Sequence, residues 1–97
     1  MTAIFLHIAT PAGGPVAAAL ARACVRAGVP WSCFLTNDGV RALADPDVVA
    51  ALKPAARAVV CEHSWHQHMG GAACPVELGS QTVNSALMAE AGRVISL

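Results

Sequence analysis

Short apolar runs that alternate with helical segments constrain the fold of this chain more than any other feature. Such runs cover Ala3–Ala9, Trp31–Leu35 and Ala56–Cys61. Each is largely continuous, as in strands of a parallel sheet covered on both faces. Strands separated by helical segments indicate βαβ units. We therefore predict an α/β fold, a small three-layer α/β/α sandwich with a mostly parallel four- or five-stranded sheet.

Helix signals fill the segments between and after these runs. Val16–Ala27 carries apolar residues on one stripe, with Val16, Cys24 and Ala27 among them, and Gly28 ends the helix. Asp45 and Pro46 are typical of a helix start, because aspartate caps a helix and proline fits its first turn. Further elements are expected as a helix over His63–Met69, an edge strand over Cys74–Leu78, a helix over Gln81–Ala91 and a closing strand over Arg93–Leu97. No linker or repeat interrupts the pattern, so we expect residues 1–97 to form a single domain.

The composition predicts that the chain associates with copies of itself. Hydrophobic residues make up 56% of it and charged residues only 12%, against roughly 25% charged in typical domains. A chain of this length buries only about two-thirds of its unfolded surface, so a monomer would leave much apolar area exposed.

Charge and hydropathy argue against two classes of partner. The net charge is zero and the basic residues form no stripe, so we expect no nucleic-acid binding. No apolar run reaches the ~18 residues of a membrane span, so we expect no membrane partner. The first residues lack the pattern of a secretory signal, and we predict a cytoplasmic protein with reduced thiols.

The segment with the most reactive composition follows the third apolar run. Cys61–His68 contains a thiol, a carboxylate, a hydroxyl, an indole and three imidazoles. In open parallel sheets, ligands bind beyond the carboxyl ends of the strands, which is where this segment begins. A helix N-terminus favours a thiolate through its dipole and its free N–H groups. We therefore predict that Cys61 is a reactive thiol; the alternative is a small apolar residue that ends a strand.

Two histidines are predicted to assist Cys61. His63 and His66 lie three residues apart and share a helix face, and a cationic imidazole nearby would lower the pKa of the thiol. Together with Cys61 or Cys74, these imidazoles also have the chemistry to ligate zinc or copper. The chain has no Cys-x-x-Cys or His-Glu-x-x-His motif, so our prediction is a site without metal or cofactor.

The other cysteines have two interpretations. Cys74 follows a glycine-rich segment and could return to Cys61 as a resolving thiol. It could equally be an ordinary buried or loop residue. Cys24 and Cys33 lie in a predicted helix and a predicted strand, and we expect both to pack in the core.

With these elements placed, the sequence resembles the DsrE/DsrF-like family of sulfur-relay proteins, which includes the TusD-type subunits. Four segments carry the likeness, in the same order along the chain. They are the apolar opening strand with its Gly/Pro-rich loop, the turn Asn37-Asp38-Gly39-Val40, the run Val59-Val60-Cys61 followed by Ser64 and Gly70, and the closing helix and strand from Leu78 to Leu97.

The resemblance implies a function and an assembly. It implies that Cys61 carries sulfur as a persulfide, and that proteins supplying and accepting sulfur are its partners. It also implies homotrimers or homohexamers, or assemblies with sister subunits. The chain departs from the family after Cys61, where relatives are commonly rich in alanine and arginine and this chain has Glu62–Met69. Some family members lack the cysteine, so the alternatives are an assembly subunit without chemistry of its own and a regulatory module that binds a metal or small ligand through His63, His66 and Cys61.

Overall fold

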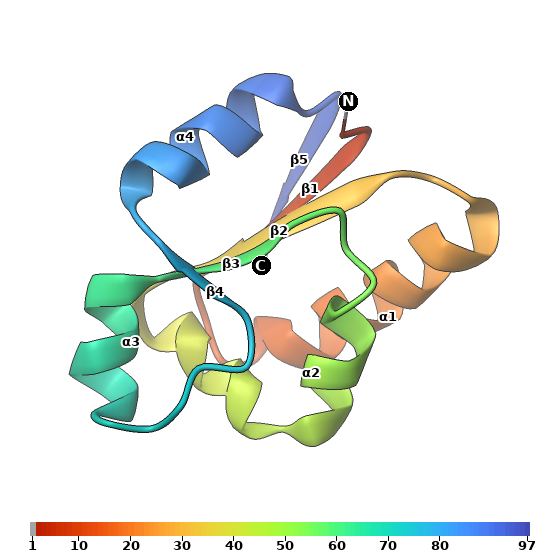
Figure 1. The fold of residues 1–97 in the computed structure, drawn as a ribbon. Coiled ribbons are helices and arrows are strands. Elements are labelled where there is room, and N and C mark those ends of the chain that lie inside the picture. The colour runs from red at the N-terminus through yellow and green to blue at the C-terminus, as the bar shows by residue number, and fades with distance from the viewer. Residues whose placement is uncertain (1) are drawn as a thin grey trace.

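The computed structural model describes residues 2–97 as a five-stranded, all-parallel sheet with helices on both faces (Figure 1). In chain order, the elements are β1 (Ile4–Ile8), α1 (Gly13–Ala27), β2 (Trp31–Leu35), the 3₁₀ helix η1 (Asn37–Ala44), α2 (Pro46–Leu52), β3 (Ala58–Cys61), α3 (Glu62–Met69), β4 (Glu77–Gly79), α4 (Gln81–Glu90) and β5 (Arg93–Ser96). The strand order is β4-β3-β2-β1-β5. The predicted α/β/α fold is confirmed, and the sheet has the larger of the two predicted strand numbers.

The two faces of the sheet are covered unequally. In Figure 1, α4 lies alone on one side of the sheet, and α1, η1, α2 and α3 lie on the other. Leu6, Leu35 and Val60 point into the larger core beneath those four helices. Phe5, Phe34 and Val59 belong to a smaller cluster closed by Leu87 of α4. Residues that alternate along each strand therefore enter different environments, and the layer under α4 is the thinner one.

Helix α1 packs through a face that shares Cys24 with the predicted stripe but leaves out Val16 and Ala27. Val16 is 49% exposed, and Ala27 is also exposed. The buried residues of α1 are small ones: Gly13, Gly14, Ala17, Ala18, Ala21 and Cys24. A Cβ atom at Gly14 would lie 2.7 Å from the Cβ of Ala42. The helix therefore approaches η1 closely along its small residues, which turns the larger Val16 outward.

Several element boundaries also differ from the sequence-based prediction. Helix α1 begins at Gly13, inside the predicted loop, and β4 begins at Glu77 rather than at Cys74. The predicted start of α2 is confirmed, since Asp45 Oδ1 accepts a 2.9 Å hydrogen bond from Asp47 N–H. Asn37 was predicted to open a turn but is the first residue of η1.

Candidate functional site

Cys61 occupies the junction between β3 and α3, with no loop between the two elements. It is the last residue of β3 and the N-cap of α3, and its φ of −62° and ψ of 117° are still extended. The residue is only 6% exposed and belongs to the cluster beneath α4. Its partner in the register of β3 and β4 is Gly79, so β4 places no side chain beside the sulfur. The predicted position at the carboxyl edge of the sheet is therefore correct.

The surroundings of Cys61 lower its thiol pKa. Burial acts to raise the pKa, but the side chain and N–H of Ser64, the side chain of Gln81 and the N–H of His63 act as donors to the sulfur and outweigh it. The Cys61 side chain makes no N-cap hydrogen bond to α3. Hydrogen bonds to a thiolate favour the charged form, so they can lower the pKa of a thiol even where burial raises it.

Ser64 is oriented by the chain that follows β2. Asn37 N–H donates a 2.9 Å hydrogen bond to Ser64 Oγ, which leaves the hydroxyl hydrogen of Ser64 available for Cys61. Asn37 adopts a φ of 53°, a left-handed conformation that asparagine tolerates better than most residues. The start of η1 thus holds the Ser64 hydroxyl oxygen in position near Cys61.

Gln81 reaches the site from the first turn of α4. Its Nε2 donates a 3.1 Å hydrogen bond to Thr36 Oγ1, and its Oε1 accepts a 3.2 Å hydrogen bond from Asn84 Nδ2. Thr36 follows β2, and the pairing of Leu35 with Val60 places it next to Cys61 at the carboxyl edge. Segments after β2, β3 and β4 therefore supply the polar side chains around one sulfur, as expected for an open parallel sheet.

Sequence reasoning missed Thr36, Gln81 and Asn84 as site residues. Gln81 was interpreted only as the beginning of a helix. The available signal was Asn84, a polar residue between the inward-facing Val83 and Leu87. A polar side chain on the buried stripe of a helix usually has a hydrogen-bonding reason for being there.

The predicted histidines lie on the outer side of α3. The side chains of His63 and His66 are exposed, and His68 is half-buried. His66 Nε2 lies 3.8 Å from Glu62 Oε1, with both side chains more than 60% exposed. His63 acts on Cys61 through its backbone N–H. A role for the two imidazoles in assisting Cys61 stays a prediction.

The other three cysteines differ from Cys61 in the direction in which their thiol pKa is shifted. Burial raises the pKa of Cys24 and Cys74, and it raises that of the fully buried Cys33 to about 12. All four cysteines are free thiols. Cys61 is thus the cysteine whose pKa is lowered.

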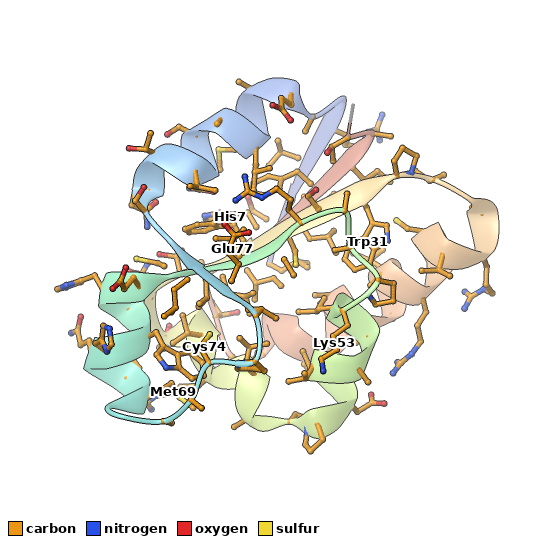
Figure 2. All side chains as sticks on the ribbon, in the orientation of Figure 1. His7, Trp31, Lys53, Met69, Cys74 and Glu77 are labelled. Carbon is orange, nitrogen blue, oxygen red and sulfur yellow. The ribbon has the colours of Figure 1, made fainter. Side chains whose placement is uncertain are left out.

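Cys74 is not placed to act as a resolving thiol. It packs against the larger core, whereas Cys61 belongs to the cluster under α4. Figure 2 shows Cys74 beside α3, near Met69 and on the side of the sheet away from α4. The two cysteines therefore lie on opposite faces of the sheet in this conformation.

Within residues 2–97, no group of three or more His, Cys, Asp or Glu side chains lies close enough together to hold a metal ion. A metal site would have to combine the histidines of α3 with Cys61. The histidines His63 and His66 are exposed, whereas Cys61 is buried in the cluster under α4. The donor groups around Cys61 are hydroxyl, amide and backbone N–H groups, which suit a thiolate better than a divalent cation.

The fold and site define an α/β protein with a cysteine of lowered pKa at the carboxyl edge of a parallel sheet. No protein-family model, curated protein or solved structure matches the chain. None of the helices formed by residues 2–97 has the length and apolar character needed to cross a bilayer.

Proposed function

We propose that this protein is a cytoplasmic sulfur carrier of the DsrE/DsrF-like class that holds sulfane sulfur as a persulfide on Cys61. The observation that carries the proposal is the set of donors around one sulfur, which lowers the pKa of Cys61 although the residue is buried. Persulfide exchange needs a cysteine that attacks as a nucleophilic thiolate in one step and leaves as a stable thiolate in the next. The likeness of four chain segments to that family supports the same function.

The chemistry requires only Cys61 and two external sulfur compounds. The Cys61 thiolate attacks the outer sulfur of a donor persulfide, R–S–SH. A new S–S bond forms at Cys61, the S–S bond of the donor breaks, and the donor leaves as the thiolate R–S⁻. An acceptor thiolate then attacks the outer sulfur of Cys61–S–SH, and Cys61 leaves as a thiolate. Neither step has a net oxidation or reduction, because one S–S bond forms as another breaks.

Each donor to Cys61 serves both steps. Ser64 and Gln81 stabilise the negative charge that the attacking sulfur starts with, and the same charge returns when Cys61 becomes the leaving group. A lower pKa makes a thiol a better leaving group while reducing its intrinsic nucleophilicity only in part. The proposed mechanism has no requirement for a metal, a cofactor or a second cysteine.

Loading of Cys61 by a low-molecular-weight persulfide tests the proposal. The protein would be incubated with the donor, treated with an electrophile that traps persulfides, and mapped by peptide mass spectrometry. We expect the trapped persulfide on the Cys61 peptide, and we expect Cys61→Ser to remove it. Cys74→Ser is the matched control, because Cys74 is partly exposed but has a raised pKa.

An unloaded Cys61 in the native protein would refute the sulfur-carrier function. In that case, a Cys61 that alkylates no faster than Cys74 would favour the alternative of an assembly subunit without chemistry of its own.

A further inference from the structure

Asn84 is a buried polar residue on the inner side of α4. It is 9% exposed, and the neighbouring inward side chains of α4, Val83 and Leu87, pack in an apolar cluster. Among residues 2–97, Asn84 Oδ1 is the buried side-chain nitrogen or oxygen atom that has no hydrogen-bond partner. An unpaired buried acceptor is destabilising, so its retention calls for a reason other than stability.

The direction of two side-chain amides supplies that reason. Asn84 Nδ2 donates to Gln81 Oε1 at 3.2 Å. Because an amide carries its oxygen and its NH2 group on opposite sides, this bond turns the NH2 group of Gln81 away from α4. That group donates to Thr36 Oγ1 at 3.1 Å. The Gln81 side chain is also one of the groups that lower the pKa of Cys61. A reversed Asn84 amide would instead place its oxygen against the oxygen of Gln81.

We propose that Asn84 is a positioning residue that keeps the NH2 group of Gln81 turned toward Thr36 Oγ1, at the carboxyl edge of the sheet beside Cys61. The inference rests on the proposed sulfur-carrier function, since a stabilised thiolate is what both transfer steps use. The unpaired Oδ1 is then a consequence of the orientation: the amide must present its NH2 group to Gln81, and its oxygen is left without a donor.

The charged groups near Cys61 come from other elements. Glu62 and His63 of α3 are exposed, and Glu77 of β4 is paired with Arg57. His7 of β1 lies on the same face of the sheet as Cys61, and burial lowers its pKa, which favours the neutral imidazole. The first turn of α4 contributes no ionisable side chain. A change at Asn84 therefore acts on Cys61 through Gln81 and not through a titrating neighbour on α4.

Asn84→Leu tests the inference, because leucine is similar in size and removes both the donor to Gln81 and the unpaired acceptor. The measurement is the pH profile of Cys61 alkylation by iodoacetamide, resolved by peptide mass spectrometry. We expect the profile to move to higher pH, and alkylation at neutral pH to slow by about three- to tenfold. The urea midpoint should stay the same or rise, which a merely structural role for Asn84 would not produce.

A double-mutant cycle with Gln81→Leu completes the test. Gln81→Leu should slow alkylation at least as much, and adding Asn84→Leu to it should have no further effect. An unchanged profile in Asn84→Leu, or additive effects in the double variant, would overturn the inference. If Asn84→Leu fails to fold, Asn84→Asp replaces it, because a carboxylate only accepts and should draw the Gln81 NH2 group away from Cys61.

The alkylation profile does not depend on sulfur transfer. A shifted profile in a protein whose Cys61 never takes up sulfur would preserve the role of Asn84 and remove the proposed function. Sulfur uptake by Cys61 together with an unshifted Asn84→Leu profile would preserve the proposed function and remove the role of Asn84.

Discussion

Cys61 and Cys33 are both buried, yet the pKa of Cys61 is lower than that of an ordinary cysteine and the pKa of Cys33 is higher. Cys33 lies in the middle of β2, where burial raises its pKa to about 12 and one backbone hydrogen bond opposes the effect only weakly. Cys61 lies where a strand becomes a helix, and side-chain and backbone donors outweigh burial there. The number and direction of donors, rather than burial alone, decides which of the two thiols ionises readily.

Replacement of Ser64 by alanine should weaken the thiolate of Cys61. The hydroxyl of Ser64 favours the charged form, so its removal raises the thiol pKa and moves the alkylation profile of Cys61 to higher pH. We expect alkylation at neutral pH to slow by about three- to tenfold. Iodoacetamide rates measured from about pH 6 to about pH 9, the range around an ordinary thiol pKa, check this.

Gln67→Ala is the matched control, because Gln67 is an exposed residue of the same helix. An alkylation profile of Ser64→Ala that coincides with that of Gln67→Ala would contradict the assignment of the Ser64 hydroxyl as a donor to the sulfur.

At the residue scale, sequence reasoning located the thiol but not the groups that act on it. Cys61 was identifiable because it ends an apolar run that is followed by polar residues. Gln81, which acts on the thiol, and Thr36, which accepts a hydrogen bond from Gln81, are distant from Cys61 in the chain. Only the pairing of β2 with β3 and the return of α4 bring them together. The imidazoles of His63 and His66 predicted a role in assisting Cys61, but both side chains are exposed on α3.

Among the elements, η1 contributes to the geometry around Cys61 through its contacts with α3 and β1. Its first residue, Asn37, orients Ser64, and its Gly39 lies against the end of β1. A Cβ atom at Gly39 would lie 2.6 Å from Ile8 O and 2.8 Å from the carbonyl carbon of Ala9. These are backbone atoms in and just after a central strand, so they cannot move aside as a flexible side chain would.

Gly39→Ala should therefore destabilise the protein strongly. Overpacking against fixed backbone is expected to cost about 2 kcal/mol or more of the free energy of unfolding, measured by urea denaturation. Gly71→Ala is the control, since no atom lies within 4 Å of a Cβ built at Gly71, and its effect should stay within about 0.5 kcal/mol. Equal stability of the two variants would show that η1 does not press on β1 in solution.

At the element scale, the apolar runs predicted β1, β2 and β3 well, because buried parallel strands are apolar along their whole length. The face of α1 was predicted only in part, since Cys24 is buried as expected but Val16 is exposed. The periodicity argument gave weight to large residues such as Val16, whereas close approach to η1 selects the small residues Gly14, Ala17 and Ala21. The steric demand of a neighbouring element is not visible in one helix taken alone.

The whole molecule exposes apolar side chains on several surfaces. Large hydrophobic residues that are at least 40% exposed occur on α1, β4 and β5: Val16, Val25, Leu78 and Val94. A mainly apolar groove of about 460 Å³ lies between α2, α3 and the segment before β4, and includes Trp65 and Met69 in its lining. A contiguous apolar surface, such as the lining of this groove, is the kind of feature that marks an interaction site, whereas single exposed apolar residues are common on monomers.

We expect the protein to sediment as a species larger than a monomer at micromolar concentration, with a trimer or hexamer as the predicted form. Burial of the exposed apolar side chains drives this association, since the effect scales with the apolar area removed from water. Sedimentation velocity over a range of concentrations measures it. A monomer throughout that range would contradict the prediction.

At the scale of the molecule, composition and pattern predicted the fold class but not how unequal its layers are. The sheet is all-parallel and lies between helices, as the alternation of elements indicated. That α4 covers one face alone follows from the order in which the strands are added, with β5 placed beside β1. This arrangement leaves the first turn of α4 over the carboxyl edge, where Gln81 meets Cys61.

Transfer of labelled sulfur tests the central claim most directly. A donor persulfide with an isotopically labelled outer sulfur would be mixed with the protein, and an acceptor thiol would then be added, with peptide mass spectrometry after each step. The account predicts label on the Cys61 peptide after the first step, its loss to the acceptor after the second, and no label on that peptide in Cys61→Ser. Label spread equally over all four cysteines, or label that stays on Cys61 when the acceptor is added, would contradict it.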